Sequence, residues 1–205
     1  VNIQPVIPIS IGPEWNVISR TILPIVDQDD ILPDGKADAS GIGDTTQSFF
    51  FSPKKPTAQG WIWGAGPVLL LPTASDDDLG GEKWGLGPTA VALRQEHGFT
   101  YGILANHIWS VAGDSDRSDI SATFLQPFFS YTTKTFTSFT INTESTYDWE
   151  DDEWSVPINF LVSQVLKIGP QPVSLQAGPR YWAESPDTGP EGWGFRFTFT
   201  LLFPK

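Results

Sequence analysis

The sequence predicts an all-β protein, a transmembrane up-and-down antiparallel β-barrel, and three observations favour this fold class. Helical periodicity is hard to find, whereas runs of β-branched and aromatic residues recur at hairpin spacing between Gly, Pro, Asp and Asn. Many of these runs are close to the roughly 9 to 11 residues that a tilted strand needs to cross a bilayer. The connections between them alternate between short and long, which is typical of outer-membrane barrels.

Eleven strands are visible in this chain, and a single domain is expected over residues 1–205. The predicted strands cover residues 2–10, 16–26, 44–52, 61–72, 84–95, 99–111, 120–131, 137–147, 154–167, 173–184 and 192–203. Bacterial single-chain barrels have even strand numbers. If directions are counted back from Lys205, the first strand begins on the outer side, so a twelfth, N-terminal strand is expected in the complete protein.

The last predicted strand shows the alternation of side chains most clearly. One parity carries Trp193, Phe195, Phe197, Phe199, Leu201 and Phe203, and the other is mostly polar. Successive side chains of a strand point to opposite faces, so one face of this strand is an aromatic wall. Such a wall faces the core of a soluble sandwich or the lipid around a membrane barrel.

The acidic residues are concentrated in one kind of connection. Of 24 acidic residues, 21 lie in the five long connections, whereas Lys54, Lys55, Lys134 and Lys167 lie in short turns. Alternate connections of a meander lie at the same end, so we expect long acidic loops outside the outer membrane and short turns in the periplasm. The formal net charge of −12 argues against a nucleic-acid partner.

Two loop stretches, "SDDDLG" and "DWEDDEW", carry carboxylates that could bind divalent cations, and "DGKAD" faintly resembles a calcium loop. None has the full spacing of an EF-hand, so solvated loop charge is the simpler interpretation. No resident metal or cofactor is expected, and the absence of cysteine excludes disulfides and thiolate metal sites.

Tryptophan and tyrosine recur near the ends of the predicted strands, where the aromatic girdles of a barrel lie. The expected girdle residues are Trp15, Trp61, Trp84, Trp109, Trp149, Trp154, Tyr181 and Trp193. Proline argues in the other direction, because it removes a ladder donor where a closed barrel has no edge. Eight prolines fall inside predicted strands: Pro5, Pro8, Pro24, Pro67, Pro88, Pro127, Pro157 and Pro179.

Polar residues in strand interiors are the candidates for an inner lining, because a charge at membrane depth should face a water-filled cavity. They are Arg20, Arg94, Gln126, Glu144, Asn159, Gln176, Arg180 and Arg196. We expect the four arginines to form a basic lining that favours anionic or polar solutes, with Glu144 as a counter-charge. In the alternative, these residues pair with one another and plug the interior.

A catalytic interpretation has little support. His107 lies near Asn106 and Ser110, as in a hydrolase that uses serine, histidine and asparagine. Nothing in the spacing places a nucleophile against a base. No enzymatic activity and no catalytic residue are therefore expected.

Several long stretches resemble a family of bacterial outer-membrane proteins. They are "QSFFFSPKKP", "GAGPVLLLPTASDDDLGGEKWGLGPTAVAL", "NHIWSVAGDSD" and "TFLQPFFSYT". The family is usually described as the transporter or phenol-degradation (MetA-pathway) family, sometimes labelled neuromedin U, and the resemblance runs from Asn2 to Lys205. It implies a barrel porin or transporter whose members carry an additional N-terminal strand, and it assigns no functional residue. The ending departs from the usual terminal aromatic residue of barrels, since Pro204 and Lys205 follow Phe203.

Three functions remain open from the sequence. The first is a porin-like channel that passes small solutes through the outer membrane, with outer-membrane lipid as its surroundings. The second is a plugged structural or surface-binding barrel with cation-binding outer loops. The third is a soluble β-sandwich that binds glycans, given nine tryptophans. The solute and the oligomeric state are not encoded in any pattern found.

Overall fold

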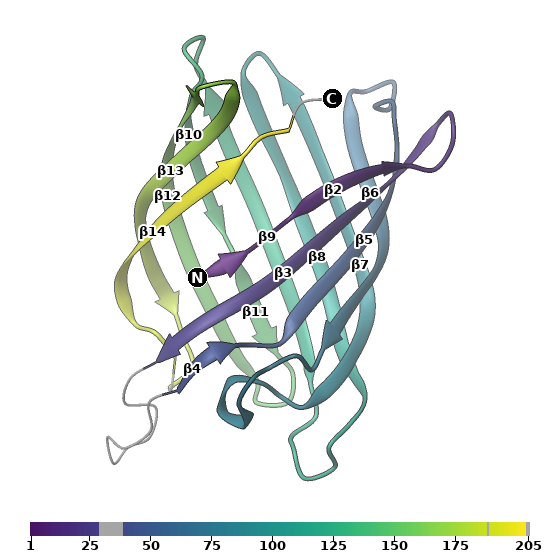
Figure 1. Cartoon of the computed structure of the whole chain (residues 1–205), viewed down its shortest axis with the longest axis vertical. Coiled ribbons are helices and arrows are strands. Elements are labelled where there is room, and N and C mark those ends of the chain that lie inside the picture. The colour runs from purple at the N-terminus through teal and green to yellow at the C-terminus, as the bar shows by residue number, and fades with distance from the viewer. Residues whose placement is uncertain (29–38, 188, 204–205) are drawn as a thin grey trace.

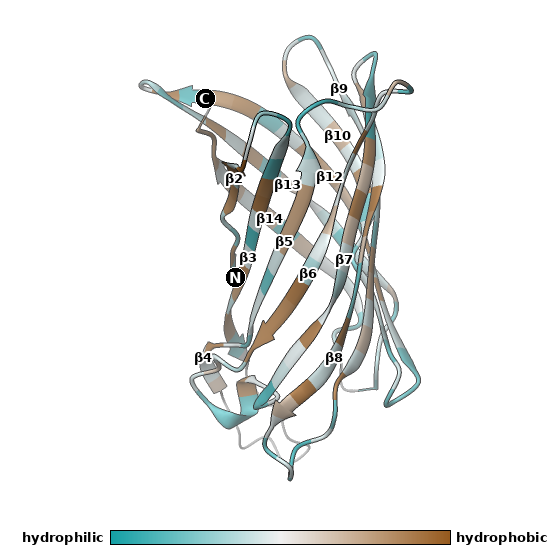
Figure 2. Ribbon diagram, turned by 90° about the vertical axis from the view of Figure 1, so that its right-hand side faces the viewer, coloured by the Kyte–Doolittle hydropathy of each residue, from teal (hydrophilic) through white to brown (hydrophobic). Residues whose placement is uncertain are grey.

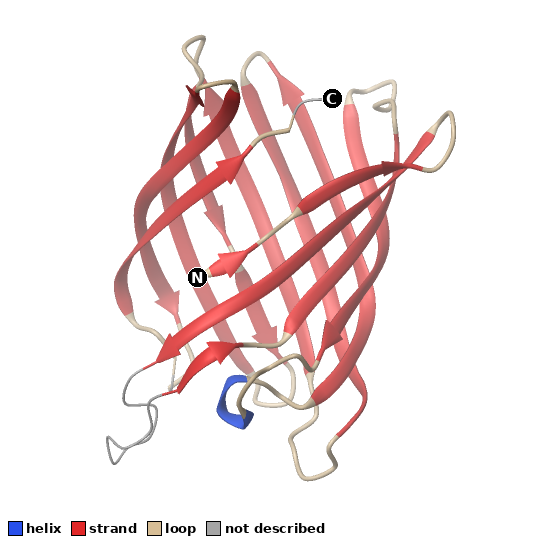
Figure 3. Ribbon diagram, in the orientation of Figure 1, coloured by secondary structure: helices blue, strands red, loops and turns tan. Residues whose placement is uncertain are grey.

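A computed structural model describes residues 1–28, 39–187 and 189–203, and within them the chain is almost entirely β-structure (Figure 3). All strands belong to one antiparallel sheet of fourteen strands. The strands are β1 (Asn2–Ile3), β2 (Val6–Ser10), β3 (Trp15–Gln28), β4 (Ala39–Ile42), β5 (Thr45–Pro53), β6 (Trp61–Leu71), β7 (Lys83–Glu96), β8 (Phe99–Gly113), β9 (Ser121–Thr132), β10 (Thr137–Thr143), β11 (Ser145–Asp148), β12 (Glu153–Ile168), β13 (Gln171–Glu184) and β14 (Gly192–Leu201). A short 3-10 helix, η1 (Asp77–Leu79), lies in a loop.

The strand order confirms the predicted all-β antiparallel meander. The main path of pairing runs β1-β3-β5-β6-β7-β8-β9-β10-β12-β13-β14, so each long strand lies between its neighbours in the sequence. All eleven predicted strands are present. The count of fourteen arises because two of them are each split in two, at Pro5 and at Glu144, and because β4 forms in a stretch that the sequence assigned to a loop. The "DGKAD" stretch lies outside the described residues.

The sheet curls until its two edges lie on the same side of the molecule (Figure 1). Among the described residues, no ladder joins β14 to β1 or β2. The short turns and the end of β14 lie at the upper end of Figure 1, and the described parts of the long connections lie at the lower end. With 16 residues, β12 is the longest strand, which corresponds to about 50 Å of extended chain.

The curl gives the sheet an inner and an outer face of different chemistry. Glu144 after β10 forms an ion pair with Arg196 on β14, although β12 and β13 lie between those strands, so these side chains are on the concave inner face. The opposite parity of β14 faces outward: Phe195, Phe197 and Phe199 are 74%, 63% and 50% exposed. In Figure 2, hydrophilic and hydrophobic residues accordingly alternate along the strands.

The inner face is partly polar. Its buried residues include Ser48, Ser52, Thr89 and Asn159, together with the apolar Phe50, Val68, Leu104 and Leu161. The described residues form no second sheet against which the aromatic wall of β14 could pack. The arrangement is therefore the reverse of a soluble sandwich, in which large apolar side chains would fill the inside.

The prolines lie where pairing is interrupted or at the sheet edge. Three Gly-Pro pairs, ending at Pro67, Pro88 and Pro179, fall in gaps of the β5–β6, β7–β8 and β12–β13 ladders. At each gap the glycine lets the neighbouring strand approach, because a Cβ there would collide with a backbone carbonyl oxygen of that strand. Of the others, Pro5 lies between β1 and β2, Pro8 lies in the edge strand β2 and Pro24 pairs with Asn2 of the edge strand β1. Pro127 lies in a gap of the pairing of β9 to β10 and β11, and Pro157 lies at a bulge.

Candidate functional site

The candidate site is a polar cluster on the inner face, and it begins at a break in one strand. Glu144 lies between β10 and β11, opposite a gap in the ladder to β9 that contains Gln126 and Pro127. Proline has no N–H to donate, so regular pairing stops at this point. The β10–β11 strand loses its regular pairing there, and the Glu144 side chain extends into the interior.

Glu144 is the centre of the cluster. Its Oε2 accepts hydrogen bonds from Nη2 of Arg180 at 2.7 Å and from Nη1 of Arg196 at 2.6 Å. Its Oε1 accepts a bond from Nε2 of Gln126 at 3.3 Å. One carboxylate therefore holds residues from β9, β13 and β14 together, and the two charge-assisted bonds are the short ones.

A chain of side chains fixes the orientation of Arg180. Its Nε donates to Oδ1 of Asn159 at 2.7 Å, and Nδ2 of Asn159 donates to Oδ1 of Asn142 at 2.8 Å. Asn159 is completely buried, so it has little freedom to move. The guanidinium carbon of Arg180 also lies 5.4 Å from the ring centroid of Trp182, within the range of a cation–π interaction.

Arg20 approaches the same cluster from β3. It lies within electrostatic range of Glu144 and Arg196. Within the described residues, Arg20 forms neither a side-chain hydrogen bond nor an ion pair. The cluster thus contains three guanidinium groups and one carboxylate, an excess of two positive charges.

The cluster borders open space. The side chains of Glu144, Arg180 and Arg196 are 21%, 23% and 24% exposed, although they lie on the inner face. Part of each charged side chain is therefore accessible to water.

The structure brings together most of the predicted lining residues, and it corrects one. Arg20, Gln126, Glu144, Asn159, Arg180 and Arg196 share the inner face, and Gln176 lies on the same face opposite Ser163 and Thr198. Arg94 does not, because its ladder partners, Trp61 and Tyr101, lie on the outer face. It forms an ion pair with Glu96 at 2.7 Å near the short-turn end. Sequence reasoning missed Asn142 and Trp182, whose strand parity would have placed both on the inner face.

The predicted girdle residues lie near the two ends of the sheet. Trp15 and Trp61 begin β3 and β6 at the short-turn end, where they form edge-to-face pairs with Trp63 and Tyr101. The other six lie at the long-loop end: Trp84, Trp109, Trp149, Trp154, Tyr181 and Trp193. Seven of the eight predicted side chains are at least 38% exposed, and Trp154 is half-buried against Tyr147.

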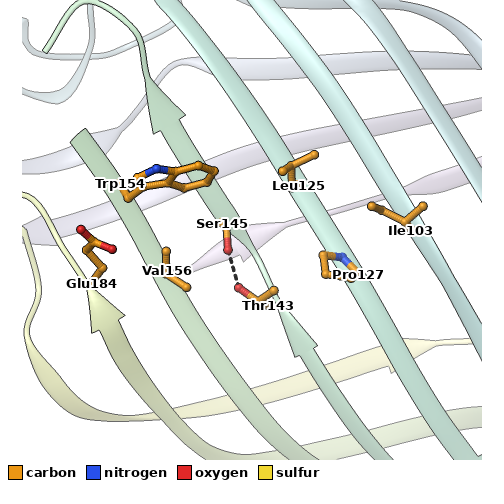
Figure 4. Close-up of a pocket in the computed structure, with 8 residues that line it drawn as sticks. All are labelled: Ile103, Leu125, Pro127, Thr143, Ser145, Trp154, Val156 and Glu184. Carbon is orange, nitrogen blue, oxygen red and sulfur yellow. Dashed lines mark hydrogen bonds between the residues drawn. The ribbon is translucent and has the colours of Figure 1, made fainter. Parts of the chain in front are cut away.

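A groove on the outer face lies beside Thr143 and Ser145, the two residues that flank the strand break (Figure 4). Its cavity volume is about 380 Å³, and it is lined by Ile103, Leu125, Pro127, Thr143, Ser145, Trp154, Val156 and Glu184. The hydroxyls of Thr143 and Ser145 bond to each other at 2.6 Å and leave a mostly apolar surface. The strand break therefore affects both the inner and the outer face of the sheet.

The three residues considered for catalysis do not lie on one face of β8. Asn106 and Ser110 lie on the face opposite His107, so the three side chains do not converge. Nδ1 of His107 lies 2.7 Å from the Thr123 hydroxyl, and its ring packs against Trp109.

The acidic loops use part of their charge internally. The Asp44 carboxylate accepts bonds from the backbone N–H groups of Ala74 and Gly81, at 3.1 and 2.7 Å. Arg117 forms an ion pair with Glu82 at 3.3 Å and donates to the carbonyls of Asp77 and Gly80. Within the ranges that the structure describes, no group of three or more His, Cys, Asp or Glu side chains could hold a metal ion.

In the described part of the chain, no helix has the length and apolar character of a membrane span. No protein-family model, characterised protein or solved structure matches this chain. The two faces of the sheet and the inner cluster are therefore the features that bear on function.

Proposed function

We propose that the protein is an outer-membrane β-barrel that lets small solutes diffuse through its interior, without a chemical step. The observation that carries this proposal is the reversed polarity of the sheet. Large apolar side chains such as Phe197, 63% exposed, cover the outer face, and an ionised cluster lies inside. Exposed apolar surface of this extent is typical of contact with lipid or with a protein partner.

Three further features support a membrane setting over a protein partner. The exposed apolar residues occur on nearly every strand rather than in one patch. Tryptophan and tyrosine lie in two bands near the strand ends, as interfacial girdles do. The described parts of the acidic connections lie together at one end, where carboxylates would stay in water. The resemblance of the sequence to an outer-membrane transporter family points to the same proposal.

A closed barrel is the second candidate, and a specific observation favours it. Arg180 and Arg196 are already paired with Glu144, and the inner face also carries buried Phe50, Val68 and Leu104. These contacts could fill the interior, in which case the acidic loops would be the functional surface. The soluble sandwich is the weakest of the three, because no second sheet covers the aromatic wall in the described residues.

Single-channel conductance in a planar bilayer tests the proposal. The refolded protein is expected to give steady current steps that increase with salt concentration. If the protein inserts into the bilayer but carries no current, the channel proposal is wrong and the closed barrel is favoured. A protein that stays folded and monomeric in buffer without detergent would contradict the membrane setting itself.

A further inference from the structure

We propose that Arg20, Arg180 and Arg196 form a binding site for one small oxyanion, the carboxylate end of an organic acid or a phosphate. This inference names the solute class of the proposed channel, and it rests on that proposal for the physiological route to the site. The site itself is an arrangement of side chains that can be tested by binding alone.

The cluster carries more positive than negative charge. Two of the three guanidinium groups share a single oxygen of Glu144, at 2.7 and 2.6 Å, and the third has no ion-pair partner in the described residues. Charges that are partly removed from water are costly unless they are paired. An anion with one or two negative charges would compensate the excess that Glu144 leaves.

The three arginine side chains are held to different degrees by their neighbours. Arg180 is fixed by the buried Asn159 and by Trp182, and Arg196 is fixed by Glu144. Arg20 is half-buried, and its five N–H donors are unused within the described residues. A solute entering the cluster would therefore find two positioned cations and one whose donors are free to turn toward it.

The shape of a guanidinium group also favours an oxyanion as the ligand. A guanidinium group presents paired N–H donors in a planar fork that matches two oxygens of a carboxylate or a phosphate. Because Arg20 reaches the cluster from β3 and Arg196 from β14, the bound anion would bridge the two edges of the curled sheet. The excess of two charges favours a dianion such as a dicarboxylate or phosphate over a monoanion.

Isothermal titration calorimetry of the full chain in detergent micelles tests the site, with succinate, inorganic phosphate and the neutral analogue succinamide as probes. Saturable binding of succinate or phosphate is expected, with none for succinamide. Binding of succinate alone would identify the carboxylate as the ligand group, and binding of phosphate alone would identify the phosphate.

Two arginine variants separate the site from general charge. Arg20→Gln is expected to weaken binding by about tenfold or more, since it removes charge-assisted hydrogen bonds to the anion. Arg94→Gln removes the same charge from the outer face and should leave binding unchanged. Arg20→Lys keeps the charge without the planar fork and should fall between Arg20→Gln and the unaltered protein.

The inference is overturned if neither anion binds saturably, or if Arg20→Gln and Arg94→Gln weaken binding equally while both retain the circular dichroism of the unaltered protein. Binding in micelles does not require a pore. If the protein binds the anion but carries no current, the channel proposal is wrong and the binding site stands. If the protein conducts but does not bind the anion, the binding site is wrong and the channel proposal stands.

Discussion

The ion pairs of Glu144 allow a quantitative test of how much the inner cluster stabilises the sheet. Glu144→Gln keeps the size of the side chain and a carbonyl acceptor but removes the negative charge between Arg180 and Arg196. Breaking a buried ion pair from one side costs about 3–5 kcal/mol. Because the three side chains are 21–24% exposed, solvent screens part of this interaction, and we expect a loss of about 2–3 kcal/mol.

A matched control is available on the outer face. Glu96 pairs with Arg94 at 2.7 Å, and those side chains are 35% and 36% exposed. Exposed pairs contribute about 0.2–1 kcal/mol, so Glu96→Gln should cost much less than Glu144→Gln even though it also removes the charge that accepts a bond from Tyr101.

Equilibrium urea unfolding in phospholipid vesicles, followed by tryptophan fluorescence, measures both losses. The dependence of the free energy on urea should keep the same slope in both variants, because the surface exposed on unfolding does not change. If Glu144→Gln and Glu96→Gln lose equal stability, to within about 0.5 kcal/mol, the reasoning that the inner cluster is held by Glu144 is refuted.

Three further predictions concern the outer face, a strand gap and a loop. Phe197→Lys on the outer face should lower stability in a bilayer by about 2–4 kcal/mol, whereas Thr198→Lys on the inner face should cost less; equal folding yields in vesicles would contradict the assignment of faces. Gly178→Ala should cost about 1–3 kcal/mol in urea unfolding, because its Cβ would collide with a backbone carbonyl oxygen of β12, and an unchanged midpoint would show that the gap can widen freely. Hydrogen bonds from Lys83 and Ser110 lower the pKa of Asp119. The stabilisation from these bonds should therefore be complete above the ordinary carboxyl pKa and be lost as pH falls through the lowered pKa. A carbon-13 titration in which Lys83→Gln leaves the pKa of Asp119 unchanged would contradict the role of Lys83.

The sequence predicted strands well where one parity differs sharply from the other. In β14 large apolar residues alternate without interruption with glycine, arginine and threonine, and both faces are as expected. In β7 the two parities differ little in hydropathy, because one carries glycine, valine and leucine and the other carries alanine and leucine. No contrast then indicates the outward face, and the rule that a charge in a strand interior faces a water-filled lumen places Arg94 on the wrong side.

The inner cluster could be predicted in part only. Strand parity indicates that Arg180 and Arg196 share a face, but their meeting with Glu144 depends on the curl of the sheet across β12 and β13. The break at Glu144 is invisible in its own segment, since the cause lies in Pro127 on the neighbouring strand. Contacts set by curvature and by a neighbour's proline leave no local signature.

The facing prolines of β6 and β7 bear on how the wall can move. The ladder within this hairpin continues from Trp61 and Arg94 to Leu70 and Gly85, with Pro67 opposite Pro88. The ladders to β5 and β8 are both interrupted at this height. The ladder within the hairpin is thus continuous at this height, whereas regular pairing to β5 and β8 is missing there, so the sheet can flex at these two gaps. Flexing at the gaps would change the width of the space on the concave side of the sheet without any change of side-chain rotamer. The amide protons beside the two gaps would then exchange first.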